Sequence, residues 1–233
     1  MLIAGVDGCP KGWAVATATV VGEALSDLRV EMVETLDSTI AKVRDGSLSA
    51  LAIDMPIGLL NEHPRTADVA ARKLLGARRS SVFPTPVLAT LDAADYDQAR
   101  VRSREVSGKA VSKQAWNLMP KIRELDALIS ADDQPAVAEA HPECAFLRLQ
   151  ADIPLDHAKS TDEGRALRIG LLRASGRFDA NELDKALTSK VAPVGDLIDA
   201  IALTVTARHM ASWTDRRLGD QVDPQGRRAE IVY

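Results

Sequence analysis

Four aspartates in this 233-residue chain stand where a carboxylate needs a positively charged partner: Asp7, Asp54, Asp196 and Asp199. Each ends an apolar run or lies in an apolar helix-like segment, and burying an unpaired carboxylate costs free energy. Carboxylates that gather in one place cannot all stay ionised without a cation. Oxygen ligands alone suit Mg²⁺ or Mn²⁺ better than zinc. Two such ions about 4 Å apart activate water and stabilise the leaving oxygen in phosphodiester hydrolysis.

Asp7 and Asp54 each end a predicted β-strand. The apolar runs Ile3–Asp7 and Trp13–Val21 flank a turn rich in Gly and Pro, which predicts a β-hairpin. Leu51–Asp54 is a short apolar run stopped by a proline two residues later, a pattern typical of a strand buried on both faces. If the two strands are parallel neighbours, both carboxylates lie at one edge of the sheet, where open α/β sheets bind ligands.

Asp196 and Asp199 lie at the start of a predicted helix over Val194–Ser212, which is apolar almost all round and should therefore be buried. Their spacing of three residues places both on one face of its first turn. An Asp at a helix start is also favoured by the helix dipole, so Asp196 is either a helix cap or a site residue. Asp199 lies deeper in apolar sequence and is the better candidate ligand.

Arg78 and Arg79 lead a loop, Arg78–Pro86, that holds two serines and two prolines. The prolines exclude regular structure, while the guanidinium groups and hydroxyls are suited to binding phosphate. A solvated basic surface loop is the alternative interpretation. Lys11, Lys121 and Lys159 are further candidates for contacts with phosphate groups.

Glu139 and His141 lie on one face of a predicted strand, Ala136–His141, which ends at a proline. A carboxylate and an imidazole at a strand end are candidates for acid–base chemistry, and His141 could relay a proton to a leaving oxygen. The alternative is an edge strand with solvated polar side chains.

Hydrophobic periodicity and turn signals predict the remaining elements. Helix Ser112–Ser130 should be kinked by Pro120, because proline removes a helical hydrogen bond. The tail Asp215–Tyr233 is expected to be irregular, with a final strand docking over Glu230–Tyr233. The other predicted elements are a strand over Leu28–Leu36 and helices over Asp37–Gly46, Arg65–Ala77, Asp92–Ser107, Cys144–Ala151 and Thr161–Ala174.

Charge is distributed unevenly along the chain. The net charge is −4, yet Arg65–Arg123 holds twelve Lys or Arg and five Asp or Glu, a local charge of +7. Such an asymmetry can pair an anion-binding region with an acidic site. A solvated helical face with surplus arginine is an equally good interpretation.

Composition bounds the class of protein. With 46% hydrophobic residues the chain can form one large domain, or one domain with an insertion. Apolar runs all fall short of the roughly 20 residues of a membrane helix, and no signal-peptide pattern is visible. Cys9 and Cys144 form neither a CxxC nor a zinc pattern, so we expect a reduced, cytoplasmic protein.

The order of elements, three strands, a helix, a strand, helices, a strand and helices, is the plan of the RNase H fold. The pair Asp196 and Asp199 resembles the helix of RuvC-type resolvases. Several segments together resemble a family of predicted RNase H-like nucleases once catalogued as a domain of unknown function. These segments are Gly5–Trp13, Ile53–Gly58, Arg78–Pro84, Gln114–Trp116, Glu139–Glu143 and Asp196–Ala200.

This resemblance implies an α/β, RNase H-like, mixed five-stranded sheet with flanking helices. It also implies a single domain over 1–233 with a helical insertion over about 62–134, between strands four and five. RNase H proper has a Glu on the helix after strand three, where this chain offers only Asp37 and Asp45. Glu139, on a different strand, is the candidate substitute.

The preferred interpretation is a nuclease that depends on Mg²⁺ or Mn²⁺. Asp7, Asp54 and Asp199 would hold the metal, Asp196 or Glu139 would complete the set, and the basic residues would hold nucleic acid. One alternative is a nucleotide-binding phosphotransferase or hydrolase of the actin–hexokinase type, although those proteins use two such domains. Another is a non-catalytic module that binds an anionic partner through the basic segment. The type of nucleic acid and the oligomeric state stay open.

Overall fold

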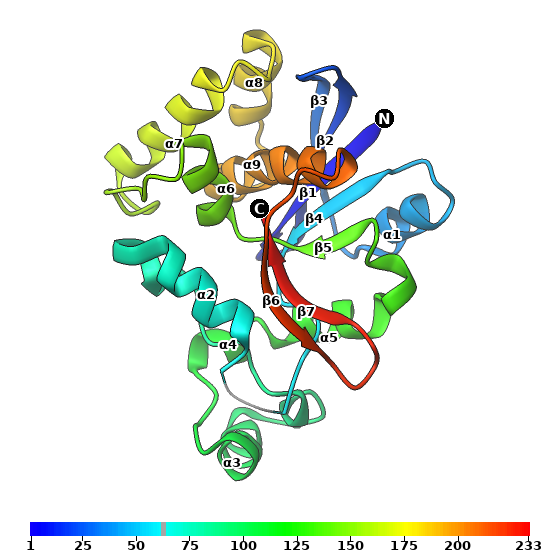
Figure 1. The fold of residues 1–233 in the computed structure, drawn as a ribbon, viewed down its shortest axis with the longest axis vertical. Helices are drawn as coiled ribbons and strands as arrows, with labels where there is room; N and C mark the ends of the chain where they lie inside the picture. Colours follow the sequence, from blue (N-terminus) through cyan, green and yellow to red (C-terminus); the bar gives the residue numbers. More distant parts are fainter. Residues whose placement is uncertain (62–63) are drawn as a thin grey trace.

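The computed structural model describes residues 1–61 and 64–233, and a five-stranded mixed sheet lies at its centre (Figure 1). Its strands are β1 (Leu2–Cys9), β2 (Gly12–Val21), β3 (Ala24–Val33), β4 (Ala50–Asp54) and β5 (Val137–Glu139). They lie in the order β3-β2-β1-β4-β5. The first three are antiparallel to one another, while β4 runs parallel to β1 and β5 parallel to β4. This is the RNase H-like sheet, and the predicted fold class is confirmed.

The hairpin formed by β1 and β2 brings the chain back through Pro10 and Lys11, with Cys9 paired to Gly12. Gly12 has a φ of 150°, and a β-carbon there would lie 2.0 Å from the carbonyl oxygen of Val33. Only glycine fits, because β3 passes directly beside the turn. The predicted hairpin is therefore confirmed, while β3 begins and ends a few residues earlier than its pattern indicated.

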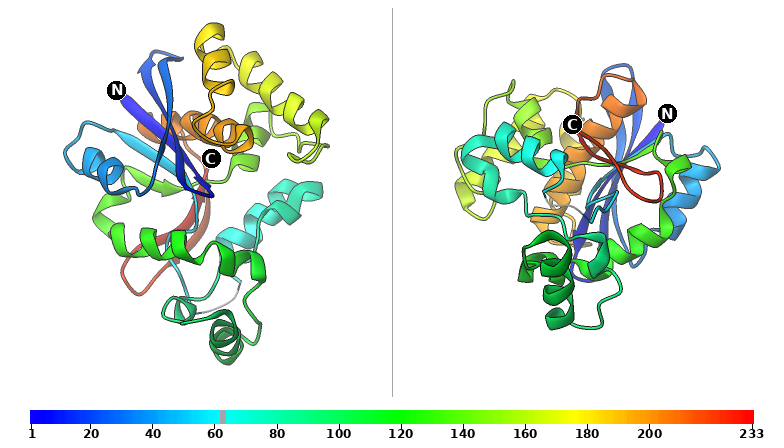
Figure 2. Two further views of the ribbon diagram at one scale, coloured as in Figure 1. Left: turned by 180° about the vertical axis from the view of Figure 1, so that it is seen from behind. Right: turned by 60° about the horizontal axis from the view of Figure 1, so that its bottom comes forward.

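Helices cover both faces of the sheet (Figure 2). On one face α9 (Val194–Ala211) packs across β1, β2 and β4. Beside it on the same face lie α6 (Pro142–Leu149), α7 (Asp162–Ala174) and α8 (Ala180–Leu187). The opposite face packs against α1 (Asp37–Arg44) and α5 (Met119–Leu128). Because α9 is buried along most of its length, the all-round apolar pattern of its sequence is explained.

The segment between β4 and β5 is largely helical and occupies the lower part of Figure 1. The predicted first residue of the insertion, at position 62, lies outside the described residues. The single kinked helix expected over Ser112–Ser130 is wrong, because the chain forms α4 and α5, which meet at Leu118. Pro120 lies in the first turn of α5, where its missing N–H is not needed, so it starts a helix instead of bending one. The remaining elements of the segment are α2 (Thr66–Leu75), α3 (Tyr96–Ser107), α4 (Lys113–Asn117) and the 3₁₀ turns η1 (Gly76–Ser81), η2 (Leu88–Thr90) and η3 (Ala131–Asp133).

Most of the tail is regular, which contradicts the expectation of an irregular segment, while the final strand expected over Glu230–Tyr233 is confirmed by the strand over Arg228–Val232. Strands β6 (Arg217–Val222) and β7 (Arg228–Val232) form an antiparallel hairpin. Val232 makes a bridge to Ala140 just after β5, and Ile231 packs with the apolar face of α2. The apolar residues of this hairpin are sparse, so its stability depends on tertiary packing that its sequence pattern does not reveal. None of the helices in residues 1–61 and 64–233 is long and apolar enough to cross a membrane.

Candidate functional site

Asp7 and Asp54 are direct neighbours across two central parallel strands. The register of β1 and β4 pairs Asp7 with Asp54, and Asp54 is the last residue of β4. Asp7 is buried, Asp54 is half-buried, and both line one cavity. The two carboxylates are therefore neighbours across parallel strands, as the sequence predicted.

The cavity beside them has a volume of about 320 Å³ and mixed charge. Its acidic side comes from the sheet and from the start of α6, and its basic side comes from η1 and from the loop before α7. The charged and imidazole side chains that line it are Asp7, Asp54, Glu143, Arg78, Lys159 and His141. Carboxylates and cations therefore share one space that is large enough for a phosphate group and its neighbours.

Asp199 lies on α9 close enough for its charge to act on Asp7, is 2% exposed and does not itself line the cavity. Its carboxylate accepts a hydrogen bond of 2.6 Å from Nζ of Lys159, whose side chain is half-exposed. Asp196 lies one turn earlier and is half-buried. It is not the cap of α9, because that position belongs to Pro193.

Burial and mutual repulsion perturb these carboxyl groups. Burial raises the pKa of Asp7 well above its usual value, and the nearby charges of Asp54 and Asp199 raise it further. Burial likewise raises the pKa of Asp54 to about 6, against the opposing effect of the Lys159 ammonium. The pKa of Asp199 and that of Asp196 are also raised, in both cases mainly by burial. Each of these carboxyl groups is therefore harder to ionise than in water, and a bound cation would favour its ionised form.

Glu143 is a member of the acidic side that the sequence interpretation missed. It lies in the first turn of α6, is 3% exposed and forms an ion pair with buried Arg168. Its Oε2 atom is buried without a hydrogen-bond partner among the described residues, and its charge contributes to the raised pKa of Asp54 and of Asp199. A Glu directly after His141-Pro142 and before an apolar run was the available signal, because a carboxylate followed by buried residues lies close to the core.

His141 caps α6 at the wall of the cavity. Its Nδ1 accepts a hydrogen bond of 3.2 Å from the backbone N–H of Glu143, and Nε2 lies 3.4 Å from the carbonyl oxygen of Ser81. Burial lowers the pKa of the imidazole. This arrangement favours the neutral ring with its proton on Nε2, which links α6 to η1.

Glu139 does not line this cavity, although it lines a smaller one together with Asp54. Its carboxylate accepts two hydrogen bonds from Arg65, of 2.7 and 2.9 Å, and one of 2.8 Å from the backbone N–H of Ile57. Arg65 is 1% exposed and also binds Asp68 and the carbonyl oxygen of Ile57. The Glu139 carboxylate thus joins β5 to the start of α2.

The predicted basic residues divide into three groups. Arg78 and Lys159 line the cavity, and the Nε atom of Arg78 is buried without a hydrogen-bond partner among the residues that the structure describes. Lys121 donates to the carbonyl oxygen of Gly12 and lies 4.4 Å from the centre of the Trp13 ring, beside the hairpin turn. Lys11 and Arg79 are exposed and do not line the cavity.

The carboxylates of this site could supply only some of the ligands that a hard divalent ion needs. No three His, Cys, Asp or Glu side chains within 1–61 and 64–233 are grouped as a ready-made metal cage. Mg²⁺, however, is usually held by one or two carboxylates together with water and substrate phosphates. The adjacent carboxylates of Asp7 and Asp54, both raised in pKa and both facing the cavity, meet that smaller requirement.

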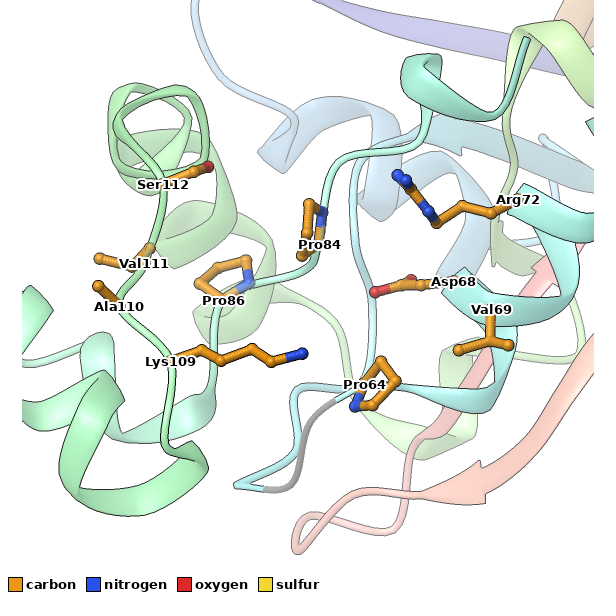
Figure 3. A pocket seen from close by; sticks show the side chains of 10 residues that line it. All are labelled: Pro64, Asp68, Val69, Arg72, Pro84, Pro86, Lys109, Ala110, Val111 and Ser112. Atoms are coloured by element: carbon orange, nitrogen blue, oxygen red, sulfur yellow. The ribbon is translucent and has the colours of Figure 1, made fainter. Parts of the chain in front are cut away.

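A second cavity of about 350 Å³ lies between α2 and the segment Lys109–Ser112 (Figure 3). Lys109 and Arg72 reach into it from opposite sides. Asp68 is already bound by Arg65, and Arg72 donates to the carbonyl oxygen of Val82. The perturbed acidic groups described above do not line it, so the candidate site is the cavity of Asp7 and Asp54.

Comparisons with known proteins give one family and two solved structures. The family model described as "Protein of unknown function (DUF429)" matches residues 5–222. The Thermus thermophilus RuvC structure is 12% identical, covers 89% of this chain and 96% of its own, and has a TM-score of 0.31. Thermus thermophilus RuvC in complex with a Holliday junction substrate is 14% identical, covers 53% of this chain and 90% of its own, and has a TM-score of 0.15. No curated protein matches the chain. Both TM-scores are too low to carry an argument, and the fold assignment above depends on the strand order.

Proposed function

Because the chain belongs to the DUF429 family of proteins of unknown function, we propose an activity from the site itself: hydrolysis of phosphodiester bonds in nucleic acid with the help of Mg²⁺ or Mn²⁺. One observation carries this proposal. Two carboxylates with raised pKa values, Asp7 and Asp54, are register partners on central strands and line a cavity that Arg78 also lines. Acidic groups that hold a cation, in one cavity with a guanidinium that binds phosphate, are what phosphodiester hydrolysis requires.

Asp7 and Asp54 would hold the metal, which when bound supplies a Lewis acid for the phosphoryl oxygen and lowers the pKa of water. Arg78 would bind the phosphate, because it lines the cavity and a guanidinium fits the geometry of phosphate oxygens. Asp199 acts from α9 by holding Lys159 within the acidic cluster. The neutral His141 is suited to keeping α6 and η1 in place, and any proton it gives to a leaving oxygen would come from Nε2.

The middle of the chain supports nucleic acid as the substrate. Most of the basic residues between Arg65 and Arg123 lie on helices α2 to α5 and on η1, and those exposed to solvent are Lys73, Arg79, Arg104, Lys109 and Lys113. Lys and Arg on such a surface neutralise backbone phosphates and bring a polyanion to the site. We propose a single RNase H-like domain with this segment as its insertion. The two free, buried cysteines fit a cytoplasmic location.

The test is a cleavage assay with single-stranded, duplex, hybrid and branched substrates in the presence of Mn²⁺. Cleavage of at least one substrate is expected, and Asp7→Asn should reduce it at least 100-fold. Asp162→Asn is the matched control, because that side chain is 93% exposed on α7. The proposal fails if no substrate is cleaved and Asp7→Asn leaves Mn²⁺ binding unchanged. Thermal stabilisation by ATP with Mg²⁺, but not by oligonucleotides, would instead support a phosphotransferase.

A further inference from the structure

Lys159 supplies the positive charge closest to the acidic cluster. Its ammonium lies 2.6 Å from the carboxylate of Asp199, and its charge lowers the pKa of both Asp7 and Asp54 against the effect of burial. Across the part of the chain that the structure describes, no other Lys or Arg forms an ion pair with Asp7, Asp54 or Asp199. The cluster thus already contains one fixed cation that belongs to the protein.

The loop that carries Lys159 is held firmly in place. Gly164 packs so closely under it that an added β-carbon would lie 1.9 Å from the carbonyl oxygen of Ala158. Thr161 caps α7 through a hydrogen bond of 3.0 Å from the N–H of Gly164, and its own N–H donates to Ala158. The backbone of Lys159 and Ser160, which lie between Ala158 and Thr161, is therefore held by contacts on both sides.

Arg168 connects this loop to the acidic side of the site. It is 1% exposed, donates to the carbonyl oxygen of His157 at 3.2 Å, and forms the ion pair with Glu143. One buried guanidinium thus fixes both the loop that bears the lysine and one of the carboxylates. An ordinary surface lysine beside an acidic residue would not need a buried ion pair to hold its loop.

We propose that the Lys159 ammonium occupies the place of a second metal ion, so that the site takes a single divalent ion between Asp7 and Asp54. This inference rests on the proposed function. An ammonium offers three donors and a compact charge, so it can neutralise Asp199 and still donate to a phosphate oxygen in the cavity. A divalent ion placed beside it would be repelled, and the carboxylate such an ion needs is already bound.

The number of bound ions tests the inference. Isothermal titration with Mn²⁺, together with electron paramagnetic resonance of the loaded protein, should give one Mn²⁺ per chain and no signal from coupled ions. Lys159→Met should take up a second Mn²⁺ and show coupling between the two. Lys159→Arg should keep one, because the charge is retained. Lys42→Met is the matched control, because that lysine is exposed on α1, on the face of the sheet opposite to α9.

The outcomes separate this inference from the proposed function. Two Mn²⁺ ions in the wild-type protein, or one in both the wild-type protein and Lys159→Met, would overturn the role of Lys159 while cleavage by the wild-type protein still supports a nuclease. No Mn²⁺ in any variant, together with no cleavage, would overturn both. Lys159→Gln is the second variant, and thermal melts identify any variant that has not folded.

Discussion

A β-carbon added to Gly5 would lie 2.2 Å from the carbonyl oxygen of Ala200. Strand β1 and helix α9 therefore touch backbone to backbone, two residues before Asp7 on the strand and one residue after Asp199 on the helix. This contact sets how close the two carboxylates come. A side chain at position 5 would push the backbone of α9, and Asp199 with it, away from β1.

Gly5→Ala should destabilise the protein by about 1 to 3 kcal/mol, since the added methyl group meets a backbone atom that cannot move freely. It should also weaken Mn²⁺ binding, because α9 shifts away from β1. Gly170→Ala on α7 is the control, because a β-carbon there has nothing within 4 Å, and the change should stabilise by up to about 1 kcal/mol. Urea denaturation measures both. Equal effects at the two positions would contradict the close contact.

Asp54→Asn should stabilise the metal-free protein at pH 8. Because folding raises the pKa of Asp54 from 3.8 to about 6, the wild-type protein loses stability as the pH rises through that window. The neutral amide avoids this loss, so we expect a gain of roughly 1 to 3 kcal/mol in the free energy of unfolding at pH 8 and a smaller gain at pH 4. Denaturation in EDTA measures the free energy of unfolding, and a lower value for Asp54→Asn than for the wild-type protein at pH 8 would contradict the raised pKa of Asp54.

Arg78→Ala should weaken nucleic-acid binding about 10-fold, because the cavity loses its guanidinium fork. In a cleavage assay the change should raise KM more than it lowers kcat. Arg173→Ala on α7 is the control, since that side chain is 58% exposed and pairs with Asp184 on the surface. Fluorescence anisotropy with a labelled oligonucleotide measures binding. Identical affinities for the two variants would show that Arg78 does not bind the substrate.

His209 on α9 should make the protein sensitive to mild acid. Burial, followed by the charges of Arg148 and Arg177, lowers the pKa of its imidazole from 6.5 to about 4. The unfolded chain then binds more protons between those pH values, so stability falls as the pH falls from about 7 to about 4. His209→Gln should remove up to roughly 3 kcal/mol of that loss. Denaturation curves at several pH values decide it, and parallel curves for the two proteins would rule out this role.

The sequence was most informative where a backbone rule linked two positions. Apolar runs that end in Asp predicted that Asp7 and Asp54 would be neighbours, because strand direction and register follow from the order of the elements. The buried character of α9 followed from its apolar pattern. Both predictions depend on geometry that repeats along the chain, so pattern alone was sufficient.

Side-chain pairing could not be predicted in the same way. Glu139 and Glu143 lie four residues apart, and only the folded structure shows that Arg65 binds the first while the second lies against the cavity. The break at Leu118 and strand β6 were also missed, although the final strand was predicted. In each case the decisive contact comes from a segment far away in the chain, which local periodicity does not record.

The buried guanidinium of Arg65 joins three parts of the chain, which are helix α2, the segment that follows β4, and strand β5. This has a consequence for the cooperativity of unfolding. The helical segment cannot open as an independent lid without leaving Glu139 and Asp68 buried and unpaired. Amide protons of α2 and β5 should therefore exchange with solvent at similar rates, through the same unfolding event. The wall that holds Arg78 and the sheet that holds Asp7 then form a single cooperative unit.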